Sequence, residues 1–156
     1  MGQAQQLANR FREVILNGKW IANTNFKEKI EDLTVAQATQ RVGSLNTIAL
    51  LTFHINYYIA GLNQVFEEGK LEIRDKYSFE LPTLETEEAW EELKQQLFRN
   101  AEVFAQHVEG LLDEDLDAPF VKEQYGDYRR NLEGMIEHSY YHLGQVSLIR
   151  KLIELG

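Results

Sequence analysis

The sequence predicts an all-α protein built as a four-helix bundle. Four long segments repeat apolar residues at intervals of three and four, which is the spacing that places side chains on one face of a helix. No segment alternates apolar and polar residues convincingly as a strand does, and the 156 residues include only two prolines. This length suits one domain with its own core, so we expect a single domain over residues 1–156.

The first helix is expected over residues 3–16, where Asn17 and Gly18 form a helix-ending pair. Its apolar stripe consists of Ala4, Leu7, Phe11 and Val14. A crossover follows, in which Thr34 and Gln37 stand at the spacing of a capping box. This motif predicts a short additional helix before the second long one.

The second long helix is expected over residues 44–68, before Gly69. Two apolar stripes widen its hydrophobic face, so it should be buried on most sides. One stripe reads Thr47, Leu51, His54, Tyr58, Gly61 and Val65. Long connections flank this helix on both sides, which makes a crossover topology feasible, although the residues alone leave a simple up-down bundle equally open.

The third and fourth helices are expected over residues 86–112 and 131–155. Thr86 is suited to cap the third helix, and the glutamates that follow it suit the positive end of a helix dipole. In the fourth helix, Met135, His138 and His142 follow the bundle repeat of about 3.5 residues.

The composition argues against several functions. Acidic residues outnumber basic ones by 25 to 16, for a net charge of −9, so a nucleic-acid partner or a polybasic membrane contact is disfavoured. The absence of cysteine excludes disulfides, thiolate catalysis and sulfur ligands, and any metal must be held by nitrogen and oxygen. The N-terminus lacks the pattern of a signal peptide and no apolar run approaches the ~20 residues of a membrane span, so we expect a cytoplasmic protein.

Three of the four histidines occupy inward positions where an aliphatic residue is expected. His138 and His142 are one turn apart on the same face, with Cβ atoms about 5–6 Å apart, and His54 lies on the inward face of the second helix. Bundle cores build metal sites from facing helices, so these three histidines are the predicted metal ligands. The alternative is that they are core histidines hydrogen-bonded to carbonyls or tyrosines. His107 has no partner histidine at helical spacing and is expected to be partly exposed or hydrogen-bonded.

The residues around the histidines narrow the type of site. Di-iron bundles use Glu-x-x-His pairs, and none of the four histidines has a carboxylate three residues before it. Zinc proteases use His-Glu-x-x-His, but Ser139 stands where that glutamate would be. Three neutral imidazoles leave open positions on an ion, as in catalytic sites.

Two segments of the chain resemble the DinB-like superfamily. Residues 44–51, leading into His54, resemble its second helix, and residues 131–146 resemble its final helix with the pattern His-x-x-x-His-x-Gly-Gln. The similarity extends over nearly the whole chain and is greatest to a small bacterial subfamily of unknown function. All three ligand positions are matched.

The resemblance implies an up-down-down-up bundle in which the second and third helices are parallel and joined by a crossover through residues 69–84. It implies a divalent ion (nickel, zinc or iron) on His54, His138 and His142, and a homodimer. Some relatives are thiol transferases that use small cellular thiols, and others are isomerases or hydrolases.

Further candidates lie near the histidines, although the catalytic residues stay unknown. Gln145 could orient a ligand histidine or a water, or be a satisfied buried amide. Tyr58 could donate a proton, or pack in the core with its hydroxyl satisfied. Asn46 could reach a cavity mouth, but capping is favoured. Residues 74–79 could roof the pocket or form a solvated loop.

Two functions follow from these observations. The first is a metal-dependent enzyme that acts on a small molecule, of the thiol S-transferase or hydrolase type. The alternative is a non-catalytic dimeric helical-bundle module for binding or stress response, and the lack of a clear acid or base in the sequence keeps it open.

Overall fold

The computed structural model describes residues 1–155 of the chain, and it confirms an all-helical fold. The long helices are α1 (Gln3–Arg12), α4 (Ile48–Glu68), α5 (Glu87–Glu109) and α6 (Tyr128–Leu155). The short elements are η1 (Glu13–Asn17), α2 (Phe26–Ile30), α3 (Val35–Thr39), η2 (Asp75–Tyr77), η3 (Asp113–Asp117) and η4 (Glu123–Tyr125). Over residues 1–155 there is no β-strand, and the one isolated bridge joins Pro119 to Asp127.

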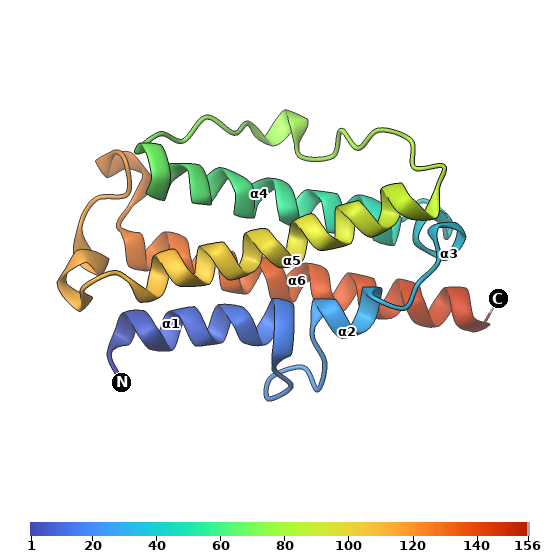
Figure 1. Ribbon diagram of the computed structural model, residues 1–156, viewed down its shortest axis with the longest axis horizontal. Helices are drawn as coiled ribbons and strands as arrows, with labels where there is room; N and C mark the ends of the chain where they lie inside the picture. The colour runs from blue at the N-terminus through green and yellow to red at the C-terminus, as the bar shows by residue number, and fades with distance from the viewer. Residues whose placement is uncertain (156) are drawn as a thin grey trace.

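The long helices have the up-down-down-up order (Figure 1). α1 and α6 run in one direction, and α4 and α5 run in the opposite direction. α4 packs against α5 and α6, and α1 packs against the same two helices from the other side. Because α4 and α5 are parallel, the chain after Gly69 must return along the length of the bundle before α5 begins, and this crossover lies along the outside of α4 (Figure 1).

Large apolar side chains fill the space between the helices. Phe11 of α1 and Phe104 of α5 meet edge to face, with ring centroids 4.5 Å apart. Trp90 is fully buried, and its indole N–H donates to the carbonyl of Leu33, 2.8 Å away, which ties the first crossover to α5. No helix in residues 1–155 is long and apolar enough to cross a membrane.

Several helix boundaries depend on caps. Thr86 caps α5, and Thr34 forms the expected capping box with Gln37 ahead of α3. The second long helix begins later than residue 44, because Thr47 accepts the capping hydrogen bond from Leu50 N at 3.1 Å. α6 begins earlier than residue 131, because the Asp127 carboxylate accepts from Arg130 N at 2.7 Å. These capped ends fix the register of the two helices that carry the histidines.

Two local features were absent from the sequence prediction. The first helix widens into a π-helical turn at Glu13–Asn17, where a regular α-helix was expected to continue to residue 16. The short helix α2 follows the exposed tip at Trp20 and begins at Phe26, after Asn25, whose side chain caps the helix by accepting from Glu28 N. Neither feature changes the placement of α4 and α6.

Candidate metal centre

The predicted cluster of three histidines is present between α4 and α6. His54 comes from α4, and His138 and His142 come from successive turns of α6. The Nε2 atom of His138 lies 2.9 Å from that of His142 and 3.3 Å from that of His54, and the ligand atoms of all three lie within 4.8 Å of one another. Two nitrogens held by one ion at about 2.0–2.1 Å, and about 90–110° apart, would be separated by about 2.8–3.4 Å. The cluster therefore has the dimensions of a metal site.

Hydrogen bonds on the far side of two rings fix the direction of their lone pairs. His54 Nδ1 donates to the carbonyl of Ser78 at 3.1 Å, and His142 Nδ1 donates to Gln145 Oε1 at 2.7 Å. With the proton on Nδ1, each Nε2 carries a lone pair that faces the centre of the cluster. Hydrogen bonds of this type orient metal-ligating histidines in proteins. The Nε2 atom of His138 lies within hydrogen-bonding distance of both lone pairs, so without an ion a proton on this atom can be donated to one of them.

The electrostatic surroundings keep these rings neutral. Burial, together with the neighbouring histidines, lowers the pKa of His138 to about 4 from its ordinary 6.5. Burial also lowers the pKa of His54 and of His142. Only a neutral imidazole can donate a lone pair to a metal ion. At neutral pH the three rings are therefore in the form that a metal requires.

The crossover between α4 and α5 roofs this cluster, as one interpretation of residues 74–79 expected. The Phe79 ring stacks on His54 with centroids 4.0 Å apart and planes 9° apart, and Ser78 is buried. Tyr57 of α4 holds the same segment, since its hydroxyl donates to Arg74 O at 3.0 Å and accepts from Arg74 N at 2.8 Å. The crossover is thus attached to α4 by two hydrogen bonds between Tyr57 and the Arg74 backbone and by the stacking of Phe79 on His54.

Tyr58 lies at the edge of the cluster with a satisfied hydroxyl. Its ring is 5.0 Å from that of His54 and 5.2 Å from that of His138, and its hydroxyl donates to Asp75 Oδ1 at 2.7 Å. Burial, and then the hydrogen bond to Asp75, raises the pKa of Tyr58, so the side chain stays a phenol at neutral pH. The hydrogen bond between Tyr58 and Asp75 lies beside the histidines, and the sequence did not reveal it, because Asp75 belongs to the crossover.

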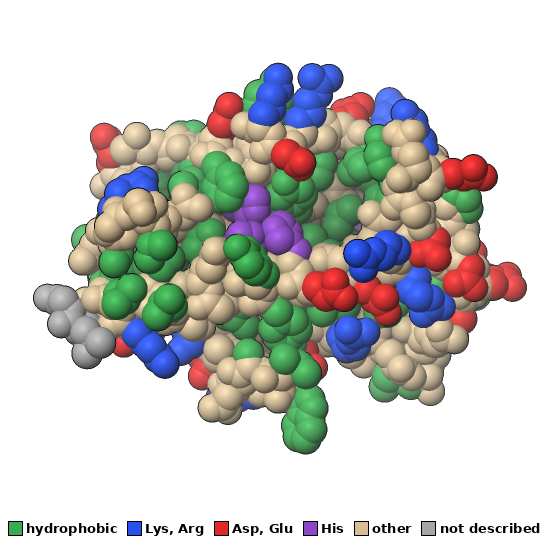
Figure 2. Space-filling model, turned by 180° about the vertical axis from the view of Figure 1, so that it is seen from behind, with side chains coloured by type: hydrophobic (Ala, Val, Ile, Leu, Met, Phe, Trp, Pro, Cys, Tyr) green, Lys and Arg blue, Asp and Glu red, His purple; other side chains and the backbone are tan. Residues whose placement is uncertain are grey.

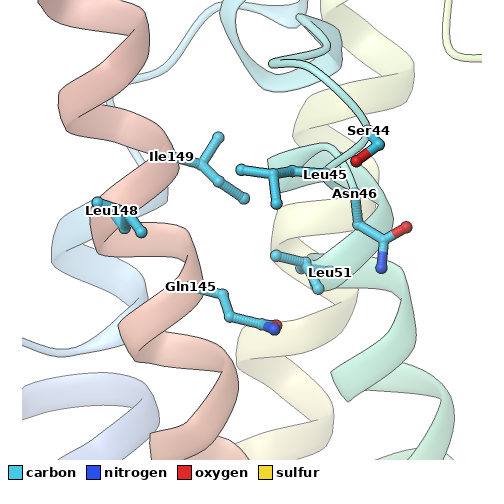
Figure 3. A pocket seen from close by; sticks show the side chains of 7 residues that line it. All are labelled: Ser44, Leu45, Asn46, Leu51, Gln145, Leu148 and Ile149. Carbon is cyan, nitrogen blue, oxygen red and sulfur yellow. The ribbon is translucent and has the colours of Figure 1, made fainter.

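The remaining candidates are placed as follows. Gln145 holds His142, as described, and its side chain also borders a cavity of about 220 Å³ between α6 and the start of α4 (Figure 3). Asn46 lines the same cavity, so the expectation that it caps the helix is wrong; Thr47 is the cap. His107 is partly exposed, stacks on Phe66 and lies 3.4 Å from a Glu67 carboxylate oxygen, and it does not belong to the cluster.

A groove leads from the cluster along α6. His138 and Tyr58 form one end, Leu62 and Met135 line it, and Arg130 lies at the other end. Its volume is about 360 Å³. Figure 2 shows histidine side chains at the surface in the middle of this face, with a hollow lined by hydrophobic side chains beside them. Small molecules therefore have access to His138 from this side.

A family model described as the DinB superfamily matches residues 22–146. The chain belongs to the DinB superfamily. The match includes all three clustered histidines and the crossover that covers them. Comparisons with curated proteins and with solved structures gave no significant match. In this DinB-superfamily protein, His54, His138 and His142 are the residues that could hold a metal ion.

The sequence indicated residues 74–79 as a possible roof, but it did not indicate the roles of Asp75 and Ser78 or the place of Arg130 in the groove. Ser78 acts through its backbone carbonyl, which every residue has and which leaves no signal in a sequence. Asp75 acts through a crossover whose course depends on tertiary contacts. The spacing of Arg130, Gly134 and His138, at i, i+4 and i+8 on one helix, was a signal that could have been used.

Proposed function

We propose that this protein is a divalent-metal-dependent enzyme that acts on a small molecule, by thiol S-transfer or by hydrolysis. The observation that supports this proposal is the convergence of three Nε2 atoms beside an open groove. Three protein ligands leave coordination positions for a substrate, whereas structural sites are more often closed by four. The groove supplies the space in which that substrate would lie.

The residues of this chain fit a metal in defined roles. His54, His138 and His142 would hold the ion through Nε2, while Ser78 and Gln145 keep two of the rings in the correct orientation and tautomer. A divalent ion there supplies Lewis-acid chemistry, which lowers the pKa of a thiol or water in an open position.

Tyr58 and Asp75 provide the proton chemistry in this proposal. The phenol of Tyr58 is protonated and lies at the end of the groove, so it can donate a hydrogen bond or a proton to a leaving group. Asp75 accepts a hydrogen bond from that phenol at 2.7 Å and so orients it, and a proton given to a leaving group is regained from solvent. Phe79 excludes water from one side of His54 by stacking on the ring.

The family resemblance supports three further parts of this proposal. The ion is nickel, zinc or iron, since imidazole ligands suit each of them. The substrate is a small molecule, and a thiol is the first class to test. The protein acts in the cytoplasm as a homodimer.

The test begins with the metal. Wild-type protein and the His54→Ala, His138→Ala and His142→Ala variants are purified and their metal content is measured by elemental analysis. His107→Ala is the matched control, because His107 lies on another helix with its own partners. We expect near-stoichiometric metal in the wild type and the control and its loss in the three variants. Full retention in any of the three would remove that histidine from the site.

The second step separates an enzyme from a binding module. The metal-loaded wild type is screened for S-transfer with several small thiols and for hydrolysis of small esters and amides. Activity that disappears in the metal-free protein and returns when the ion is added supports the proposal. Tight metal binding without turnover in either screen would favour the non-catalytic module.

A further inference from the structure

The groove beside the histidines carries a positive charge at the end away from His138. Among the residues that line it, Arg130 is the side chain that is charged at neutral pH. Its side chain is 73% exposed, and its guanidinium lies 3.9 Å from the Glu137 carboxylate, a loose contact between two exposed groups. Exposed pairs of this kind contribute little, so the guanidinium remains available to a better placed anion.

A glycine in the N-terminal part of α6 keeps the groove open. Gly134 lies between Arg130 and His138 at successive i, i+4 positions, so the three residues follow one face of the helix. A Cβ added at Gly134 would meet no atom within 4 Å. Glycine in a helix interior costs about 1 kcal/mol relative to alanine. Nothing in the packing requires glycine at this position, and its effect is to leave the floor of the groove free.

The dimensions of the groove limit what can occupy it. Eight residues of α-helix rise about 12 Å, and the arginine and histidine side chains occupy part of that span. Between the two ends, Leu62 on α4 and Met135 on α6 provide apolar wall, and Tyr125 and Asn131 also line the groove. A ligand that contacts both ends must therefore be a short molecule with an apolar part beside Leu62 and Met135 and an anionic group at the Arg130 end.

We propose that the groove over Gly134 binds an elongated organic anion, with its carboxylate on Arg130 and its reactive end at the three histidines. This inference rests on the proposed function and adds a substrate class to it. Arginine pairs with carboxylates through two parallel hydrogen bonds, which orient a ligand as well as attract it. The anion replaces Glu137 as the partner of Arg130, so the negative charge of Glu137 weakens binding.

The test uses two probes of equal length that differ in charge. Cobalt-loaded protein is titrated with 6-mercaptohexanoate and with 6-mercaptohexanol, and binding is followed by the change in the visible spectrum of cobalt. We expect Arg130→Ala to weaken 6-mercaptohexanoate about tenfold and to leave 6-mercaptohexanol unchanged. Glu137→Gln should strengthen the acid alone. Equal affinity of Arg130→Ala and wild type for the acid would overturn the proposal.

Two further variants test whether the probes bind in the groove itself or respond only to the loss of a nearby positive charge. Arg129→Ala removes the adjacent positive charge, which lies 3.6 Å from Asp117 and does not line the groove, so it should bind both probes as the wild type does. Gly134→Leu fills the groove and should weaken both probes while the protein still folds and loads cobalt. Unchanged binding in Gly134→Leu would show that the ligand lies elsewhere.

The cobalt spectrum before any thiol is added reports the metal site by itself. If cobalt does not bind, the proposed function fails, and the anion site is tested separately with hexanoate. The amide signal of Gly134 is then followed by NMR in wild type, Arg130→Ala and Arg129→Ala. A shift that needs Arg130 but not Arg129 supports the anion site, and a shift unaffected by Arg130→Ala overturns it.

Discussion

Gly61 of α4 and Gly134 of α6 offer a matched pair of substitutions that isolates one contact of the crossover. Both glycines lie inside long helices, so replacing either with alanine gains about 1 kcal/mol from helix propensity. The space around the two glycines differs. A Cβ at Gly134 would meet nothing within 4 Å, whereas a Cβ at Gly61 would lie 2.5 Å from Cγ2 and 2.7 Å from Cδ1 of Ile73.

The clash at Gly61 sets the expected magnitude. Ordinary carbon contacts begin at 3.4 Å, so Ile73 must move by about 1 Å, and overpacking of this size costs about 1–3 kcal/mol. After the gain in helix propensity, Gly61→Ala should be destabilised by about 0–2 kcal/mol and Gly134→Ala stabilised by about 1 kcal/mol. Urea unfolding, with the slope checked for constancy, measures both.

The same variant reports on the metal centre. Ile73 and Ser78 belong to one crossover, and Ser78 orients His54 through its carbonyl, so movement at Ile73 should weaken metal binding in Gly61→Ala. Gly134→Ala should bind metal as the wild type does. Competition with a chromophoric chelator measures the two affinities. If Gly61→Ala proved as stable as Gly134→Ala and bound metal equally well, the crossover would not be held by this contact and the reasoning would be refuted.

Three other changes have expected outcomes. Gln145→Leu removes the acceptor for His142 Nδ1 and should weaken metal binding about 10–100-fold in the chelator assay; unchanged affinity would exclude an orienting role. The metal-free protein should lose stability to urea as the pH falls from 6.5 toward 4. The folded state lowers the pKa of His138 to about 4, so below the ordinary value of 6.5 the unfolded chain binds more protons; a flat profile would contradict this. Trp90→Phe leaves the buried carbonyl of Leu33 without its donor and should cost about 1–3 kcal/mol in the same unfolding assay.

The sequence predicted the helices and the histidine cluster because both depend on local spacing. His138 and His142 are one turn apart in any α-helix, and the apolar stripe of α4 shows that His54 faces inward. The helix ends were less predictable. Ser44, Asn46 and Thr47 can each cap a helix, and in α4 it is Thr47 that does so. Asn46 was misassigned for the same reason, and its side chain lines a cavity instead.

The roof of the site could not be predicted in detail from the sequence. Phe79, Ser78 and Asp75 lie in a segment with little periodic structure, and their positions depend on contacts with α4. The reciprocal hydrogen bonds between Tyr57 and Arg74, and the fit of Ile73 over Gly61, place this segment. Each is a tertiary contact between chain segments that no helical spacing relates.

The bundle topology itself contributes to the candidate metal centre. Because α4 and α5 are parallel, their connection has to run back along α4, and it passes directly over His54. A hairpin between antiparallel helices would have left the Nδ1 of His54 facing solvent or an apolar neighbour. Here the returning segment supplies the Ser78 carbonyl that fixes the tautomer and the Phe79 ring that shields the imidazole. The crossover that the fold requires is therefore also the part that prepares His54 as a ligand, and changes in the crossover should alter the metal site without touching any of the three histidines.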